Sequence, residues 1–266
     1  MELIGYGLAV LIGLLLSLLG GGGSILTVPV LVYVFLIDPK IATAYSLLIV
    51  GVTSLIASVN YMRKGLASPK TALFFSFPSF IMVFLTRKYL MPLIPEELFR
   101  IGNFVFSKDT AIMSLFAVLL LLASSSMIRN NRKEINDLDS ARNKLNYPLV
   151  FSEGLLVGIL TGIVGVGGGF LIIPVLTAII RLPMKLAVGT SLMIIAINSI
   201  IGFMGDIGKH EMDWAFLTSF IGLAVIGVGI GLYLSKFISN RMLKPGFGVF
   251  ILIMGCWILL KELLLK

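Results

Sequence analysis

Residues 20–31 read GGGGSILTVPVL, and residues 165–176 read GVGGGFLIIPVL. The second stretch begins 145 positions after the first (165 − 20), and shifting residues 11–64 by that offset gives 18 identities in 54 positions without a gap. The chain is therefore internally duplicated. Each glycine cluster interrupts a long apolar run, so each half is predicted to contain a helix that is broken inside a hydrophobic environment.

The composition places the chain in a membrane. Hydrophobic residues make up 58% of it, charged residues only 13%, and the mean hydropathy is +1.06. Apolar runs of about 17–25 residues, the length that crosses a bilayer core, recur along the whole chain. The net charge of +8 resides in Lys and Arg at the edges of these runs, which indicates a lipid bilayer as the partner and no nucleic acid. We expect a multi-pass protein of the cell membrane.

The first apolar run, residues 3–37, is too long to be one straight helix. At 1.5 Å per residue it would measure about 52 Å, against about 30 Å for the bilayer core. The four consecutive glycines predict a break at residues 20–23, after which Ser24 is expected to cap a second, shorter helix. The same argument predicts a break at residues 165–169 in the second half.

Three plainer spans follow each broken element. The predicted fold is all-α, a polytopic membrane protein made of two inverted repeats, each a glycine-broken helical hairpin plus three transmembrane helices. The first repeat covers residues 1–128, a cytoplasmic linker covers 129–147, and the second repeat covers 148–266. The expected spans are 41–61, 71–90 and 109–128, then 186–205, 214–235 and 246–264.

The distribution of positive charge favours inversion of the repeats. If each broken element folds back as a hairpin, the loops at 63–70, 129–147, 181–185 and 236–244 share one side and hold 13 of the 21 Lys and Arg. If each broken element crossed the membrane once, the two sides would hold 11 and 10 and show no bias. The positive-inside rule therefore predicts that the linker is cytoplasmic and that both termini lie outside.

The paired glycine motifs, each followed by an A-x-x-x-S-L or A-x-G-T-S-L segment, resemble those of the sulfite exporter TauE/SafE family. The resemblance spans essentially the whole chain and implies a permease for small sulfur-containing or organic anions such as sulfite and sulfonates. The halves differ where Ala44-Tyr45-Ser46 stands in place of Gly189-Thr190-Ser191. The positions that match the family are Gly20, Gly22, Gly23, Ser24, Pro29, Ser46, Gly165, Gly167, Gly168, Gly169, Pro174, Thr190 and Ser191.

Glycines at a helix break leave backbone N–H groups accessible at the start of the next half-helix, where the helix dipole also favours an anion. Inverted repeats would bring the half-helix starts at Ser24 and Phe170 together near the midplane. The alternative is that the glycines only allow close helix packing. Asn198 joins the set because an amide in lipid needs a partner. The expected substrate-binding residues are Gly20, Gly22, Gly23, Ser24, Ser46, Gly165, Gly167, Gly168, Gly169, Phe170, Thr190, Ser191 and Asn198.

The predicted function is that of a secondary transporter for a small anion, with no cofactor and no metal, coupled to a proton or a sodium ion. A passive anion channel is the alternative, because it would use the same half-helix ends. An intramembrane enzyme is less favoured, since no buried acid or nucleophile with a cationic partner is found at the centre of any span.

Overall fold

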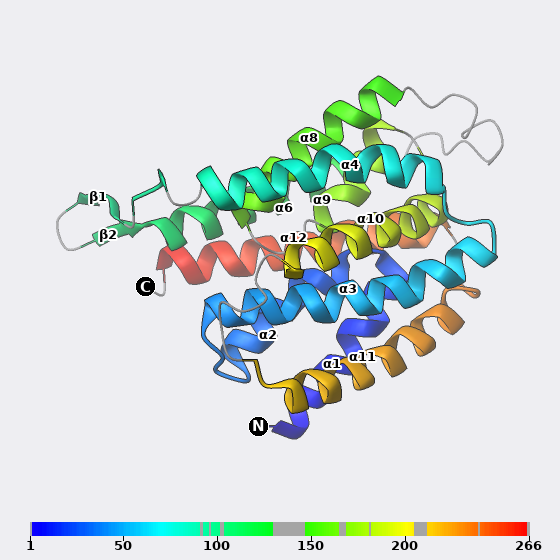
Figure 1. Ribbon diagram of the computed structural model, residues 1–266, viewed down its shortest axis with the longest axis horizontal. Coiled ribbons are helices and arrows are strands. Elements are labelled where there is room, and N and C mark those ends of the chain that lie inside the picture. Colours follow the sequence, from blue (N-terminus) through cyan, green and yellow to red (C-terminus); the bar gives the residue numbers. More distant parts are fainter. Residues whose placement is uncertain are drawn as a thin grey trace.

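The computed structural model describes residues 2–90, 93–95, 97–101, 104–129, 147–164, 169–180, 182–204, 212–238 and 240–264. These form a bundle of long helices that run roughly along one axis of the molecule (Figure 1). The helices are α1 (Glu2–Leu19), α2 (Gly22–Tyr33), α3 (Pro39–Arg63), α4 (Pro69–Leu85), α6 (Lys108–Arg129), α8 (Tyr147–Val164), α9 (Gly169–Pro174), α10 (Met184–Met204), α11 (Trp214–Leu234) and α12 (Asn240–Leu264), with short π-helical segments at Thr86–Leu90 and Val175–Ile179.

The first helix breaks where the glycines predict. Helix α1 ends at Leu19, Gly20 takes the left-handed conformation with φ +68°, and α2 begins at Gly22. Helix α2 folds back along α1. The evidence is that Gly23 contacts the backbone of Ile12 and Leu16, so closely that no side chain would fit there. At 12 residues, or about 18 Å, α2 is too short to cross a bilayer.

The prediction that Ser24 caps this half-helix is wrong. The N-cap is Gly21, and no side chain bonds to the first turn. Ser24 lies inside the helix, and its hydroxyl donates back to the Gly21 carbonyl at 2.7 Å. A glycine adopts the N-cap conformation without a side chain, so the helix begins two residues before the first residue able to cap it.

The other elements follow the prediction closely. The six plain spans are observed as α3, α4, α6, α10, α11 and α12, each within a few residues of its expected bounds except that α12 begins at Asn240, before the expected 246. The second break, at residues 165–168, lies outside the described residues, and α9 begins at Gly169. One feature was not predicted, an antiparallel hairpin of β1 (Glu97–Ile101) and β2 (Phe104–Ser107).

The first helix of each repeat packs on a helix of the other repeat. Helix α1 packs in parallel on α11 of the other repeat, and α8 packs in parallel on α4. These contacts are equivalent residue by residue: Gly13 touches the backbone of Ala224, and Gly158, 145 positions later, touches the backbone of Ser79, 145 positions before Ala224. Small residues let these helices approach to backbone contact, as is common in membranes.

Equivalent helices of the two repeats also cross each other. Helices α3 and α10 are antiparallel, with Gly51 against Ser199 and Gly202 against Leu47. The midpoint of this crossing falls close to Thr53 and its counterpart, 145 residues on. Helices α6 and α12 are antiparallel as well. The described helices are thus related by an approximate two-fold axis that reverses their direction.

Reversed helix directions are what inverted repeats require. The α3–α4 connection, the end of α6, the start of α8 and the α11–α12 connection lie at one end of the bundle, and both chain termini lie toward the other (Figure 1). Four helices, at Ile41–Arg63, Pro69–Leu90, Met184–Met204 and Trp214–Leu234, are long and apolar enough to cross a membrane by length and composition. Which end faces the cytoplasm stays a prediction.

The α1–α11 contact gives a stability prediction. Gly227 faces the Val10 carbonyl with no room for a Cβ, whereas Gly222 on the same helix has nothing within 4 Å. We expect Gly227→Ala to lower the unfolding temperature of the detergent-purified protein by several degrees, because overpacking costs about 1–3 kcal/mol. Gly222→Ala is the matched control and should unfold at or slightly above the wild-type temperature. Equal behaviour of the two variants would contradict the parallel α1–α11 packing.

Candidate functional site

The start of α9 lies beside the start of α2. A Cβ on Gly169, the first residue of α9, would lie 3.1 Å from the Ser24 hydroxyl and 3.2 Å from the Gly21 Cα. Ser24 and Gly169 are exactly one repeat offset apart (24 + 145), so the approximate two-fold axis passes between the starts of the two half-helices. Phe170, which the sequence predicts at this point, is the second residue of α9.

The start of α2 leaves its backbone donors unused by side chains. The first N–H groups of a helix have no partner within the helix, and here neither Gly21 nor Ser24 caps them. The partial positive charge of a helix N-terminus therefore points toward the place where α9 begins. Gly20, Gly22, Gly23, Ser24 and Gly169 are the predicted site residues that the structure gathers around this point.

Gly20 anchors the first break to α10. Its carbonyl accepts a hydrogen bond from the Ser191 hydroxyl at 3.1 Å, and that hydroxyl is shared with the Val188 carbonyl at 2.8 Å. A Cβ on Gly20 would lie 2.6 Å from the Ser191 Oγ and 2.9 Å from the Val188 Cα. Ser46 is the equivalent of Ser191 in the first repeat and is likewise buried.

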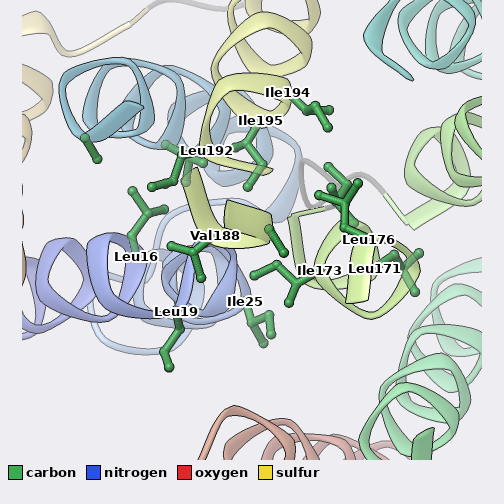
Figure 2. Close-up of a cluster of buried hydrophobic side chains, with 14 of the residues drawn as sticks. Leu16, Leu19, Ile25, Leu171, Ile173, Leu176, Val188, Leu192, Ile194 and Ile195 are labelled. Carbon is green, nitrogen blue, oxygen red and sulfur yellow. The ribbon is translucent and has the colours of Figure 1, made fainter. Parts of the chain in front are cut away.

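Apolar side chains surround the meeting point of the breaks. Figure 2 shows Leu16 and Leu19 of α1, Ile25 of α2, Ile173 of α9 and Val188 of α10 converging on one cluster. Within this cluster, Ile173 and Ile195 reach the positions that a Cβ would take on Gly20 and Gly169, at 3.1 and 2.7 Å. These two side chains occupy the space beside Gly20 and Gly169, so a ligand that binds there has to displace them.

Thr190 lies apart from the break and makes a structural contact. Its hydroxyl accepts a hydrogen bond from the Ser68 backbone N–H at 3.0 Å. The equivalent bond in the other half runs from the Asp213 N–H to the Tyr45 hydroxyl at 2.7 Å. Ser68 and Asp213 are the N-cap residues of α4 and α11, so the different residues at this position serve the same purpose in both repeats.

Asn198 carries a polar atom that is buried without a partner. Its Nδ2 donates to the Ser79 hydroxyl at 3.0 Å, but its Oδ1 accepts no hydrogen bond and only 4% of the residue is exposed. Within hydrocarbon such an atom is unfavourable unless a ligand or water fills the gap. In the part of the chain that the structure describes, the hydroxyls of Ser54, Ser76, Ser114, Thr161 and Ser199 are also buried without a hydrogen-bond partner.

Ser54 and Ser199 are equivalent positions at the α3–α10 crossing. Polar groups without partners therefore lie beside the same two-fold axis as the helix breaks. Ser76, Ser79 and Thr161 were not among the sequence-predicted site residues, because isolated Ser and Thr in apolar helices usually bond to their own backbone. Gly165, Gly167 and Gly168 lie outside the described residues.

Among the described residues, no group of three or more His, Cys, Asp or Glu side chains lies close enough to hold a metal ion. The ligand-binding groups that the site offers are backbone N–H groups, hydroxyls and one amide. Backbone N–H groups and hydroxyls at a helix start are donors of the kind that bind anions.

The model of the sulfite exporter TauE/SafE family matches residues 6–258, and the chain belongs to this family. A "probable membrane transporter protein" of Xylella fastidiosa is 27% identical over 257 residues, covering 95% of this chain and 92% of that protein. The "probable membrane transporter protein YunE" of Bacillus subtilis is 24% identical over 272 residues, covering 94% of each chain. No solved structure matches. The protein is thus a multi-pass membrane transporter protein.

Proposed function

We propose that the protein is a secondary transporter that moves small oxyanions, sulfite or short organosulfonates among them, across the cell membrane. The observation that carries the proposal is that the start of α9 at Gly169 lies beside the start of α2 at Gly21 and Gly22, whose first turn has no side-chain cap. The names of the family and of its relatives support transport, and the family description mentions sulfite. The substrate class is inferred from the chemistry of the site.

Helix N-termini favour negative charge, and two of them facing each other favour it additively. No Lys or Arg lies at the centre of a predicted span. The anion is therefore expected to bind to neutral donors and not to a positively charged side chain. The unpartnered Asn198, Ser54 and Ser199 can then bind water or a coupling sodium ion beside the anion. We infer micromolar to millimolar affinity, since neutral donors alone hold the substrate.

The proposed repeats are inverted across the membrane, so the site on their two-fold axis can face either side in turn. The side chains of Ile173 and Ile195 and the backbone of Val188 lie against Gly20 and Gly169. In the proposed cycle, α10 and one broken hairpin separate on one side while the other side stays closed. A passive channel is the alternative, and the flux assay below distinguishes the two.

The test is a flux assay in proteoliposomes with sulfite, thiosulfate, sulfoacetate, acetate, phosphate and a cationic amine, with and without a proton or sodium gradient. We expect uptake of sulfite or a short sulfonate against its own gradient when the coupling ion gradient is imposed, and no amine flux. Downhill flux alone, whatever ion gradient is imposed, would establish the channel alternative. Amine transport without any anion flux would refute the anion site.

A further inference from the structure

Three lysines from three separate segments gather at one end of the bundle. Lys64 follows α3, Lys185 lies in the first turn of α10, and Lys236 follows α11. Tertiary contacts hold the first two segments together, since Gly189 packs against the Leu66 carbonyl and the Ser68 N–H donates to Thr190. Ser17 joins the third segment to them, because its carbonyl accepts from the Tyr61 hydroxyl and its side chain packs against Gly231 of α11. The end in question carries the α3–α4 and α11–α12 connections (Figure 1).

Among the described residues, no carboxylate forms a salt bridge with Lys64, Lys185 or Lys236. The Lys236 ammonium lies over the Tyr233 ring, 5.5 Å from its centroid. The pKa of Lys64 is lowered, first by partial burial and then by the charges of Lys236 and Lys185. Like charges held together without a counter-ion are unfavourable, so a bound anion would stabilise this end of the molecule.

Helices α3 and α10 connect the lysine cluster to the first helix break. One turn before Lys64, the Tyr61 hydroxyl donates to the Ser17 carbonyl at 3.0 Å, and Ser17 is three residues from Gly20. One to two turns after Lys185, Val188 and Ser191 contact Gly20 directly. Both lysine-bearing helices therefore lead from the surface to the break.

We propose that Lys64, Lys185 and Lys236 form an anion-capture site at the mouth of the pathway, where a small oxyanion binds before it reaches the glycine breaks. Anion binding at the lysines does not depend on the proposed function. Only the later passage of the anion to the glycine breaks rests on it. The shared ligand chemistry is a tetrahedral or pyramidal oxyanion, which either a soluble substrate or the phosphate of an anionic lipid supplies.

The sequence does not repeat this lysine set at the equivalent positions of the other half. The repeat offset pairs Lys64 with Lys209 and Lys185 with Lys40, but it pairs Lys236 with Met91. Lys209 and Met91 lie outside the described residues.

The experiment compares wild type with the triple variant Lys64→Gln, Lys185→Gln, Lys236→Gln. The triple Lys→Arg variant keeps the charge, and Lys70→Gln removes an exposed charge from the same end outside the cluster. Thermal shift of the purified proteins is measured with sulfite and with a short-chain phosphatidylglycerol. Sulfite flux is measured in purely zwitterionic liposomes at low and high salt.

We expect the Gln variant to show a smaller thermal shift than wild type, and a KM for sulfite about tenfold higher with little change in kcat. High salt should raise the wild-type KM toward that of the Gln variant, because it screens the lysine charges. The Arg variant and Lys70→Gln should behave like wild type. A lysine-dependent shift with sulfite assigns the site to the soluble substrate, and a lysine-dependent shift with phosphatidylglycerol alone assigns it to lipid; both support an anion site.

An unchanged thermal shift with both ligands in the Gln variant would overturn the proposal. Failure of the transport proposal is distinguishable from this result. In that case wild type would show no flux, but the lysine-dependent thermal shift would remain.

Discussion

Gly20→Ala is expected to reduce oxyanion flux by at least about tenfold, equivalent to 1.4 kcal/mol or more. Two effects add at this position. Gly20 has φ +68°, which an L-residue adopts at a cost of about 1–2 kcal/mol. In addition, the new Cβ would lie 2.6 Å from the Ser191 Oγ and 2.9 Å from the Val188 Cα, so α10 must shift away from the break.

The chain offers a matched control for the first of these effects. Gly65 also has φ +68°, but nothing lies within 4 Å of a Cβ placed there. Gly65→Ala therefore carries the backbone strain without the contact at the break, and it should transport at close to the wild-type rate. The measurement is initial sulfite flux per folded protein, with the folded fraction taken from size-exclusion chromatography.

The comparison separates a site from simple packing. If Gly20→Ala lost folded protein in the same proportion as flux, the glycine would serve packing alone. If it folded and transported normally, the break at Gly20 would have no part in the pathway. Loss of flux in a protein that folds like Gly65→Ala is the result that places Gly20 in the transport pathway.

Most of the fold could be predicted from the internal duplication and its constant offset. Because the duplication keeps a constant spacing of 145, equivalent contacts recur as exact pairs, such as Gly13 with Ala224 and Gly158 with Ser79. The helix bounds were predictable because long apolar runs end at charges, Pro or Gly. The break at Gly20 was predictable because glycine is the residue that adopts positive φ without strain.

Other features depend on contacts between distant segments, which no local pattern reveals. The motif suggested that Thr190 donates to the substrate. In the structure, the Thr190 hydroxyl accepts a hydrogen bond from the backbone N–H of Ser68, 122 residues earlier in the chain. The exchange of partners between α1 and α11 is set by glycines on both helices. The β1–β2 hairpin has no counterpart in the second repeat, so the duplication could not predict it.

Orientation in the membrane gives the other large, all-or-none prediction. In a Cys256→Ala background, single cysteines at Leu93 and Phe237 should react with an impermeant thiol reagent from opposite sides of the membrane. Both positions are well exposed, at 78% and 72%, and both lie in connections outside the long helices. Cys256 itself is exposed and must be removed first.

The positive-inside rule assigns Phe237 to the cytoplasm, because its connection belongs to the side that holds 13 of the 21 Lys and Arg. Intact cells should therefore label Leu93→Cys and spare Phe237→Cys, and permeabilised cells should label both. The reverse pattern would keep the inverted fold but turn the lysine cluster to the outside, making it a capture site for uptake. Labelling of both from outside would contradict the prediction that the repeats are inverted across the membrane.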